Sequence, residues 1–397
     1  MSSGIMPPVE LQMTLLLFFA LAGYLLASRI NQSAVVGEIL LGLIVGPSVL
    51  GLITYTEFVQ AIAGMGAVIL MFVIGFDFKI KDLANVKYGI IAVVGIIVPW
   101  LGGYGISIAF GFAQHSALFI GTALTATSIA ITANVLKEMC ILDSESAKAI
   151  IGTAVIDDIL SLLLLSITAD VAFGTFSIEG LAFIIIKQVG FLIILALIGL
   201  FVVSKMIVKM DQSPIAKNYP EFVFIFAVMI AFLFAAMSEY IGISGIIGAF
   251  IAGVSFNGID LVHSRNIAEG GEYLYVIFAS IFFVSLGILV DLTVLTVPVL
   301  IFIAAITAIA ILTKVVGCAI PARIMGYSKR DSLAIGFGMS PRGEVAMIVA
   351  LLGLNLSLIG QDIYASIIVM SILTTVITPI AFRNWLFKEE VAACRVE

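Results

Sequence analysis

Apolar stretches of about 20 residues follow one another along the whole chain, separated by short polar connections. A stretch of this length is what a helix needs to cross the hydrocarbon core of a bilayer. We therefore predict an all-α polytopic membrane protein with about thirteen transmembrane helices. The expected spans lie at roughly 10–28, 33–52, 57–76, 88–112, 116–136, 147–169, 179–204, 219–238, 243–257, 272–289, 296–322, 332–353 and 362–385.

Composition agrees with this interpretation, since 62% of the residues are hydrophobic and only 11% are charged. The first apolar run, Leu11 to Ala27, has no basic region before it and no small-residue cleavage pattern after it, so we expect a retained span. The connections are short, and we expect no appended nucleotide-binding or regulatory domain. The three cysteines are scattered and suggest neither a disulfide framework nor a metal site.

The positive charges predict the topology. Of the 19 Lys and Arg residues, only Lys187, Lys314 and Arg342 fall well inside expected spans, since Lys148 and Arg383 lie within three residues of a span end. All the others fall in alternate loops or at the C-terminus. By the positive-inside rule, the N-terminus lies outside and the C-terminus lies in the cytoplasm, which agrees with an odd number of spans. We expect the protein in the plasma membrane.

Glycines indicate an internal repeat. Gly42 in the second span and Gly253 in the ninth are 211 residues apart, and Gly75 and Gly287 are 212 apart. This offset covers seven helices, an odd number, so the second copy would be inverted in the membrane, as in many secondary transporters. Chance alignment of frequent glycines is the alternative.

Two spans are interrupted by residues that disfavour a helix. The twelfth contains 336–344, Gly-Phe-Gly-Met-Ser-Pro-Arg-Gly-Glu, and we expect a break at Pro341 because proline removes a backbone donor. The fifth contains the polar segment 125–128, and its Ser128 lies 212 residues before Ser340. Hydroxyl density and repeat symmetry predict a second break there. Two broken helices that cross would bring half-helix ends together at one site.

Charges inside the apolar runs mark the candidate site. Asp157 and Asp158 are adjacent in one run, and Lys314 lies in another. Each such group costs roughly 2.5–3.5 kcal/mol at mid-membrane, which points to function. Adjacent helical residues point about 100° apart, so one acid can pair with Lys314 while the other faces the cavity between the broken helices. A purely structural ion-pair network is the alternative interpretation.

The same cavity has the chemistry for a hard cation. Carboxylate, hydroxyl and carbonyl oxygens are suitable ligands for sodium, and Thr127 and Ser128 are the nearest hydroxyl candidates. Protonation of the acid would remove the charge that the cation needs, so the two ions compete, which is sufficient for antiport if the empty site crosses the membrane slowly. Arg342 and Glu344 flank the break and, with Ser340, are expected to support the crossover.

Taken together, the run Thr127-Ser128-Ile-Ala-Ile-Thr132, the pair Asp157-Asp158, Lys314 and the crossover Ser340-Pro341-Arg342-Gly343-Glu344 resemble sodium/proton antiporters. The match is to the NapA type, within the monovalent cation:proton antiporter-2 family, which shares the NhaA fold. The resemblance covers essentially the whole chain. It implies that Asp158 binds sodium and protons, and that Asp157 forms a switchable salt bridge with Lys314. It also implies electrogenic exchange, a homodimer and no cofactor.

The resemblance further implies a division of the chain. A dimerisation domain would comprise 1–82 and 211–292, a core ion-transport domain would comprise 83–170 and 293–397, and 171–210 would form a linker helix.

Other functions remain open. A potassium/proton antiporter differs only in cavity geometry. A sodium-coupled solute symporter of similar fold, such as the bile-acid type, is disfavoured because symport does not require a titratable pair. A channel or a sensory protein would show no competition between ions. Enzymatic activity lacks support, since no metal-ligand cluster, nucleotide loop or nucleophile-base pairing occurs in the sequence.

Overall fold

The computed structural model describes residues 8–76, 78, 85–173, 178–219, 221–257, 259, 267–290, 296–388 and 390, and the regular structure of this part is entirely helical. Basic residues Lys79, Lys81, Arg265 and Arg395, and the expected domain boundaries near 82 and 292, lie outside it. The helices are α1 (Val9–Arg29), α2 (Ala34–Val45), α3 (Glu57–Gly75), α5 (Val86–Ala109), α6 (Gln114–Ala123), α7 (Ile129–Glu138), α8 (Glu145–Phe173), α9 (Ile178–Ile198), α10 (Ser204–Asp211), α11 (Pro214–Asn218), α12 (Glu221–Ile241), α13 (Gly245–Val254), α14 (Ile267–Ile288), α15 (Val297–Ile324), α16 (Lys329–Gly338), α17 (Glu344–Asn355) and α18 (Gln361–Ala381).

Long apolar helices dominate the fold. Among the described residues, nine helices have at least 18 residues and are apolar enough to span a membrane, which confirms a polytopic membrane protein. Two expected spans are shorter than predicted: α2 has 12 residues and α13 has 10. Every residue of α13 is buried, so protein rather than lipid surrounds it. The expected span 179–204 is longer, because a π-helical turn at 199–203 joins α9 to α10.

Both expected helix interruptions are present. One span is divided between α6 and α7 and the other between α16 and α17. Proline alone does not explain the second break, since α5 and α15 continue through Pro99 and Pro321. Pro341 differs because Gly338 and Gly343 flank it. The two breaks also hold each other open, since the Ser128 backbone N–H donates to the Pro341 carbonyl at 2.8 Å. Each non-helical segment of the crossing therefore provides a hydrogen-bond partner for a backbone group that has none within its own helix.

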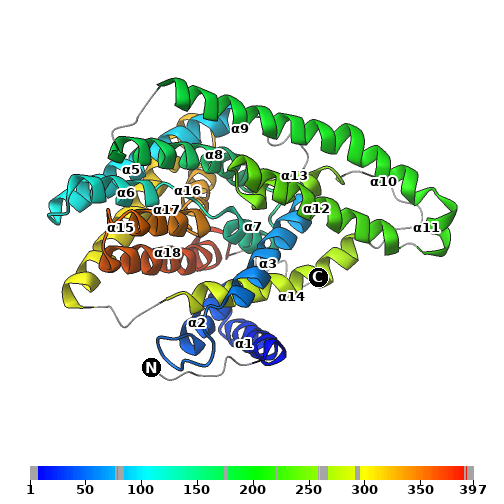
Figure 1. Cartoon of the computed structure of the whole chain (residues 1–397), viewed down its shortest axis with the longest axis horizontal. Helices are drawn as coiled ribbons and strands as arrows, with labels where there is room; N and C mark the ends of the chain where they lie inside the picture. The colour runs from blue at the N-terminus through cyan, green and yellow to red at the C-terminus, as the bar shows by residue number, and fades with distance from the viewer. Residues whose placement is uncertain are drawn as a thin grey trace.

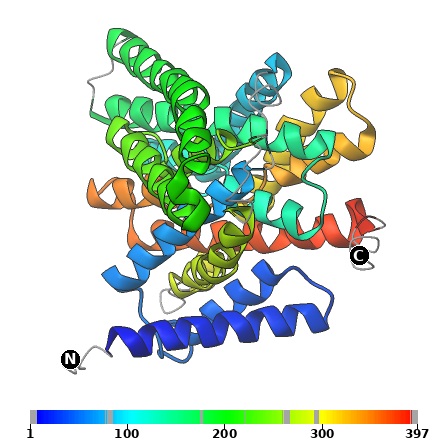
Figure 2. The same ribbon diagram turned by 90° about the vertical axis from the view of Figure 1, so that its right-hand side faces the viewer.

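The helices pack in two groups. Helices α1, α2, α3, α12, α13 and α14 contact one another extensively, and we call them the glycine-packed group. Helices α5 to α8 and α15 to α18 contain both breaks, and we call them the crossing group. The principal contacts between the groups join α3 to α7 and α2 to α18. Both views place α1 and α9 at opposite edges of the molecule (Figures 1 and 2).

Glycines allow backbones in the glycine-packed group to touch. A Cβ added at Gly37 of α2 would lie 2.1 Å from the Gly23 carbonyl oxygen of α1. A Cβ added at Gly248 of α13 would lie 2.2 Å from the Phe234 carbonyl oxygen of α12. These two contacts are made by residues 211 positions apart, so the same helix-pair packing occurs twice along the chain.

The two ends of the molecule differ in how the groups meet. We call the side where α1 and α3 end the basic side, since Arg29 and Lys137 lie there at helix ends. On this side, Ile74 of α3 and Leu136 of α7 belong to one buried apolar cluster that joins the groups. Toward the opposite side, a cavity of about 500 Å³ separates them, and Gln60 of α3 and Leu162 of α8 are among its lining residues.

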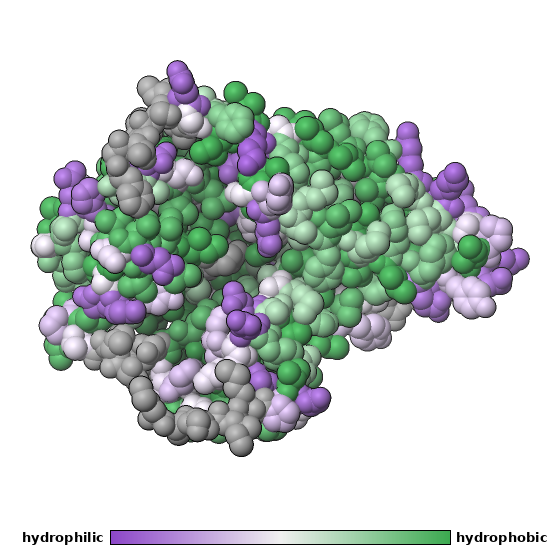
Figure 3. All heavy atoms as spheres, viewed as in Figure 1, coloured by the Kyte–Doolittle hydropathy of each residue, from purple (hydrophilic) through white to green (hydrophobic). Residues whose placement is uncertain are grey.

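The molecular surface has the character expected for a lipid environment. Large apolar side chains such as Phe18, Phe183 and Ile301 are 58–67% exposed. The space-filling view shows apolar residues over most of the right-hand part of the molecule, with hydrophilic residues gathered at its far end (Figure 3). Such a broad apolar surface is compatible with lipid and not with water.

Replacement of Gly66 by alanine tests the close packing. An added Cβ would lie 2.2 Å from the Phe278 carbonyl oxygen of α14, so backbones must move apart. We expect Gly66→Ala to lower the stability of the purified protein by ~1–3 kcal/mol in thermal unfolding. Gly64→Ala on the same helix is the control, because nothing lies within 4 Å of its added Cβ. It should be neutral or stabilising by up to about 1 kcal/mol. Equal losses in the two variants would contradict the packing described.

Candidate functional site at the helix crossing

The two acids of the site lie on α8, beside the crossing of the broken helices. Asp157 is completely buried and Asp158 is 7% exposed. They are carried by an uninterrupted helix of 29 residues, so their positions are fixed by a rigid element. Because adjacent helical residues point in different directions, the two carboxylates face different surroundings.

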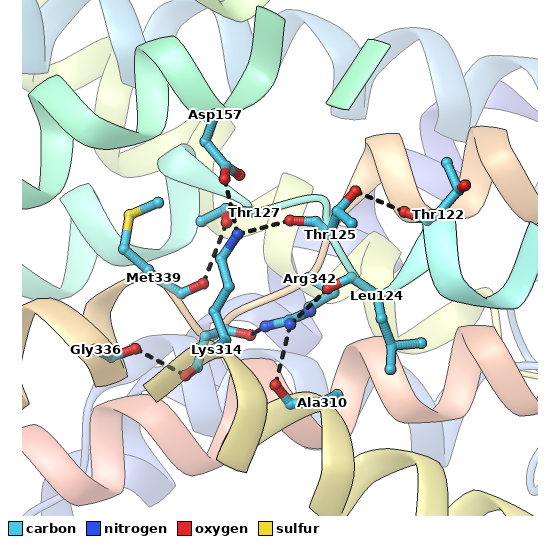
Figure 4. A network of polar contacts seen from close by, with 11 residues as sticks. Thr122, Leu124, Thr125, Thr127, Asp157, Ala310, Lys314, Gly336, Met339 and Arg342 are labelled. Atoms are coloured by element: carbon cyan, nitrogen blue, oxygen red, sulfur yellow. Dashed lines mark hydrogen bonds and ion pairs between the residues drawn. The ribbon is translucent and has the colours of Figure 1, made fainter. Parts of the chain in front are cut away.

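Asp157 forms an ion pair with Lys314 of α15. The Lys314 Nζ lies 2.8 Å from the Asp157 Oδ1, and both side chains are 0% exposed. The same ammonium donates to the Thr125 carbonyl at 2.7 Å, in the loop that follows α6. Figure 4 shows Lys314 reaching between Asp157 and this loop. Removal of either partner would leave a buried charge without compensation, which is costly in a low-dielectric interior.

Arg342 brings a second cation to the same loop. Its Nη2 donates to the Leu124 carbonyl at 2.7 Å and to the Ala310 carbonyl of α15 at 3.1 Å, and its Nη1 donates to the Ser340 carbonyl. The carbonyl end of α6 therefore receives both Lys314 and Arg342 (Figure 4). A helix C-terminus carries partial negative charge, so the two cations stabilise the end of α6. Its carbonyl groups would otherwise have no hydrogen-bond partner at membrane depth.

The carbonyl end of α16 is satisfied by hydroxyl groups instead. Thr132 Oγ1 donates to the Gly338 carbonyl at 2.6 Å, and Thr127 Oγ1 donates to the Met339 carbonyl at 3.2 Å. Ser340 Oγ donates back to the Gly336 carbonyl at 3.0 Å. The two helix ends differ in electrostatics, since two cations meet the carbonyls after α6, whereas two threonine hydroxyls and a single guanidinium group, that of Arg342 on the Ser340 carbonyl, meet those after α16.

Two oxygen atoms at the crossing have no hydrogen-bond partner among the described residues: Ser128 Oγ and Asp157 Oδ2. Ser128 precedes α7, and its hydroxyl lies against the backbone at the start of α17, where a Cβ on Gly343 would come within 2.6 Å of it. The positive ends of two half-helices therefore meet here. Free hydroxyl and carboxylate oxygens are ligands that a hard monovalent cation accepts.

The structure brings most of the expected site residues together. Asp157, Thr127, Ser128, Lys314, Ser340 and Arg342 all lie at the crossing, and Asp158 is next to it on α8. The ion pair with Lys314 is made by Asp157, as the family resemblance implies. The side chain of Glu344 lies outside the described part of the structure, so its expected support of the crossover stays a prediction.

The sequence interpretation missed a contribution from α18. Thr374 Oγ1 accepts from the Arg342 backbone N–H at 3.2 Å, and Thr375 Oγ1 donates to the Arg342 carbonyl at 3.0 Å. These two hydroxyls bind the backbone of the broken segment from α18. A signal was available, because α18 carries a stripe of hydroxyl residues at helical spacing within an apolar span: Ser371, Thr374, Thr375 and Thr378.

Comparison with known proteins gives a consistent result. The family description "Sodium/hydrogen exchanger, transmembrane" matches residues 15–388. The Na(+)/H(+)-K(+) antiporter GerN of Bacillus cereus is 36% identical over 367 residues, 92% of each chain. The Na(+)/H(+) antiporter of Enterococcus hirae is 30% identical over 375 residues, 93% of this chain and 96% of that one.

The fold is also similar to a solved structure. The sodium proton antiporter MjNhaP1 from Methanocaldococcus jannaschii at pH 8 superimposes with a TM-score of 0.69 at 18% sequence identity. The similarity covers 96% of this chain and 98% of that one. At this identity the likeness concerns the fold alone.

Replacement of Lys314 tests the buried pair. In Lys314→Gln, the Asp157 carboxylate loses its charge partner, and we expect a loss of about 3–5 kcal/mol in stability, measured by thermal unfolding in detergent. Lys148→Gln is the control, because Lys148 makes only a partly exposed contact of 3.5 Å with Glu145. It should change stability by no more than about 0.5 kcal/mol.

The double variant Asp157→Asn/Lys314→Gln completes the cycle. It removes both charges, so it should recover part of the stability lost in Lys314→Gln. A double variant that is less stable than the sum of the two single changes would contradict the pairing.

Proposed function

Because the chain belongs to the sodium/hydrogen exchanger family, we propose that it exchanges sodium or lithium ions for protons across the plasma membrane by alternating access. It is a multi-pass membrane transporter, and its relatives are antiporters. The observation that carries the proposal is the pair Asp157-Asp158 at the crossing of two broken helices, with one acid held by Lys314. A purely structural network would need one acid only.

In this mechanism Asp158 is the ion and proton carrier. Sodium binds to its carboxylate, with Thr127 and Ser128 as candidate ligands, and a proton displaces the sodium by neutralising the same carboxylate. Since the two ions compete for one group, the site carries sodium in one direction and protons in the other. Asp157 and Lys314 form a second switch, in which the ion pair opens when Asp157 accepts a proton and reforms when it is released.

We assign the chain more narrowly to the NapA type, within the monovalent cation:proton antiporter-2 family and with the NhaA fold. Two adjacent acids and Lys314 support this assignment, and with it electrogenic exchange, in which more than one proton moves for each sodium ion. Its thirteen crossings would be the nine long apolar helices, the short helices α2 and α13, and the two broken pairs.

Internal symmetry supports an inverted repeat. An added Cβ on Gly42 would lie 3.1 Å from the Gly287 Cα, and one on Gly75 would lie 2.8 Å from the Gly253 Cα. Gly42 matches Gly253 in the proposed repeat, and Gly75 matches Gly287. Each position therefore contacts the counterpart of the other, which is the pattern that a pseudo-two-fold axis produces.

The two helix groups correspond to two proposed functional units. The crossing group would be the mobile core domain, 83–170 and 293–397, and the glycine-packed group would be the dimerisation domain, 1–82 and 211–292, with 171–210 as linker. Close backbone packing in the glycine-packed group supports a fixed role for it. We propose a homodimer formed through this group, with the basic side in the cytoplasm and the N-terminus outside.

A potassium/proton antiporter is the second candidate, and the observation that favours it is the 36% identity to the Na(+)/H(+)-K(+) antiporter GerN. The two functions use the same acids and differ in the cations that the cavity accepts.

Proton efflux from acid-loaded proteoliposomes tests the proposal. Sodium, lithium or potassium is added with the membrane potential clamped at two values. We expect sodium and lithium to drive proton efflux at a rate that changes with the potential. A potassium response would assign the chain to the second candidate. No response to any cation, from protein shown to be folded, would contradict both.

Substitution of Asp158 tests the site. Asp158→Asn removes the titratable carboxylate but keeps the size of the side chain, so we expect exchange to fall below detection while the thermal unfolding profile stays near that of wild type. Asp362→Asn is the control, since Asp362 lies exposed in the first turn of α18. It should retain full exchange. Sodium-driven proton flux in folded Asp158→Asn protein would overturn the assignment.

A further inference from the structure

A set of polar contacts on the basic side joins the two helix groups and takes no part in the ion site. At its centre is Glu138, the last residue of α7. Its Oε2 accepts from the Ser33 hydroxyl at 2.6 Å and from the Ala34 backbone N–H at 3.2 Å. Both donors belong to the start of α2, more than 100 positions earlier in the chain.

The position of Glu138 is that of a helix cap. Ser33 precedes α2, but its own side chain makes no capping bond to that helix. The Glu138 carboxylate supplies the acceptor instead, and a negative group at a helix N-terminus is favoured by the partial positive charge there. A residue of the crossing group therefore caps a helix of the glycine-packed group.

Neighbouring residues hold the carboxylate in place. Asn134 Nδ2, one turn earlier on α7, donates to Glu138 Oε1 at 3.0 Å. The Asn134 side-chain oxygen accepts from the hydroxyl of Tyr275 on α14. Lys137 reaches Glu272 of α14 at 2.6 Å and lies over the Tyr275 ring. The Lys137–Glu272 pair is partly exposed, so it contributes little by itself, and the direct link from α7 to α2 is made by Glu138.

The contacts matter because the groups are separated at the opposite side. There the cavity of about 500 Å³ lies between α3 of one group and α8 and α17 of the other, with Gln60, Leu162 and Val345 among its lining residues. The structure is thus closed on the basic side and open on the other. To open on the basic side, α7 has to leave α2, and the bonds of Glu138 have to break.

We propose that Glu138 is a gating residue: its carboxylate, bound to the N-terminus of α2, holds the basic side closed and so sets the balance between the two access states. The proposal rests on the exchange by alternating access proposed above. Sodium and protons do not bind to Glu138 in this scheme. It acts by stabilising one state, so its loss shifts a population rather than abolishing the chemistry.

Cysteine labelling tests the proposal without any transport assay. Ile74, buried in the apolar cluster between α3 and α7, is replaced by cysteine in a background where Cys140, Cys318 and Cys394 are changed to alanine. A membrane-impermeant maleimide is applied from the basic side. We expect Glu138→Gln to raise the labelling rate roughly tenfold, because the open state becomes more populated. Ser33→Ala should raise it less, since the Ala34 N–H still binds the carboxylate.

Glu145→Gln is the matched control. Glu145 is an acid at the start of α8, and its partner Lys148 is in the same helix. This ion pair therefore does not connect the two helix groups. Its labelling rate should equal that of the Ile74→Cys parent. Equal rates in Glu138→Gln, Ser33→Ala and the control would overturn the proposal. If Glu138→Gln does not give monodisperse protein, Ser33→Ala alone decides the outcome.

Transport from each side separates the two proposals. In oriented proteoliposomes, Glu138→Gln should lower the apparent KM for sodium at the basic side and raise it at the opposite side, with Asp158-dependent exchange retained. Unchanged KM values on both sides, in protein that exchanges sodium, would overturn the gating role alone. Wild-type protein that exchanges no cation would overturn the proposed function, while the labelling result would still report on the contact.

Discussion

The buried pair of Asp157 and Lys314 and the break in the first crossing helix depend on each other. Lys314 can reach the Thr125 carbonyl only because α6 ends at Ala123 and leaves that oxygen without a helical partner. The end of α6, in turn, is stable at membrane depth only because two cations bind its carbonyl groups. Helix α8 supplies the counter-charge. The remaining helices of the crossing group pack around this arrangement.

The two broken segments set the geometry of the site, whereas most of its charge comes from other helices. The two broken segments support one another through backbone contacts, so the shape of the site follows from the crossing. The charges come from α8, α15 and the break before α17. Hydroxyl groups contribute to both, since Thr127 and Thr132 bind carbonyl groups of the crossing while Ser128 Oγ lies beside them without a partner among the described residues.

Much of this organisation was readable from the sequence, and the reasons are specific. Charges in apolar runs identified Asp157, Asp158 and Lys314, and a proline among glycines identified the break at Pro341. The lengths of α2 and α13 were overestimated, and for α13 the reason is that complete burial by protein removes the length requirement that lipid imposes. Thr374 and Thr375 were missed, since hydroxyl residues in a span have no distinctive meaning until their face is known. Glu138 resembles an ordinary surface acid at a helix end, and only tertiary packing brings Ser33 to it.

The distance along the chain between the partners of the buried pair also affects synthesis. Lys314 follows Asp157 by 157 residues, which a ribosome adds in roughly 8–30 s. Helix α8 therefore emerges before the cation that pairs with Asp157 exists, and the end of α6 waits longer, because Lys314 follows Thr125 by 189 residues. The first half of this protein cannot complete its native contacts alone. The pair can form only after α15 has been made, so a chain truncated before α15 lacks the cation that pairs with Asp157.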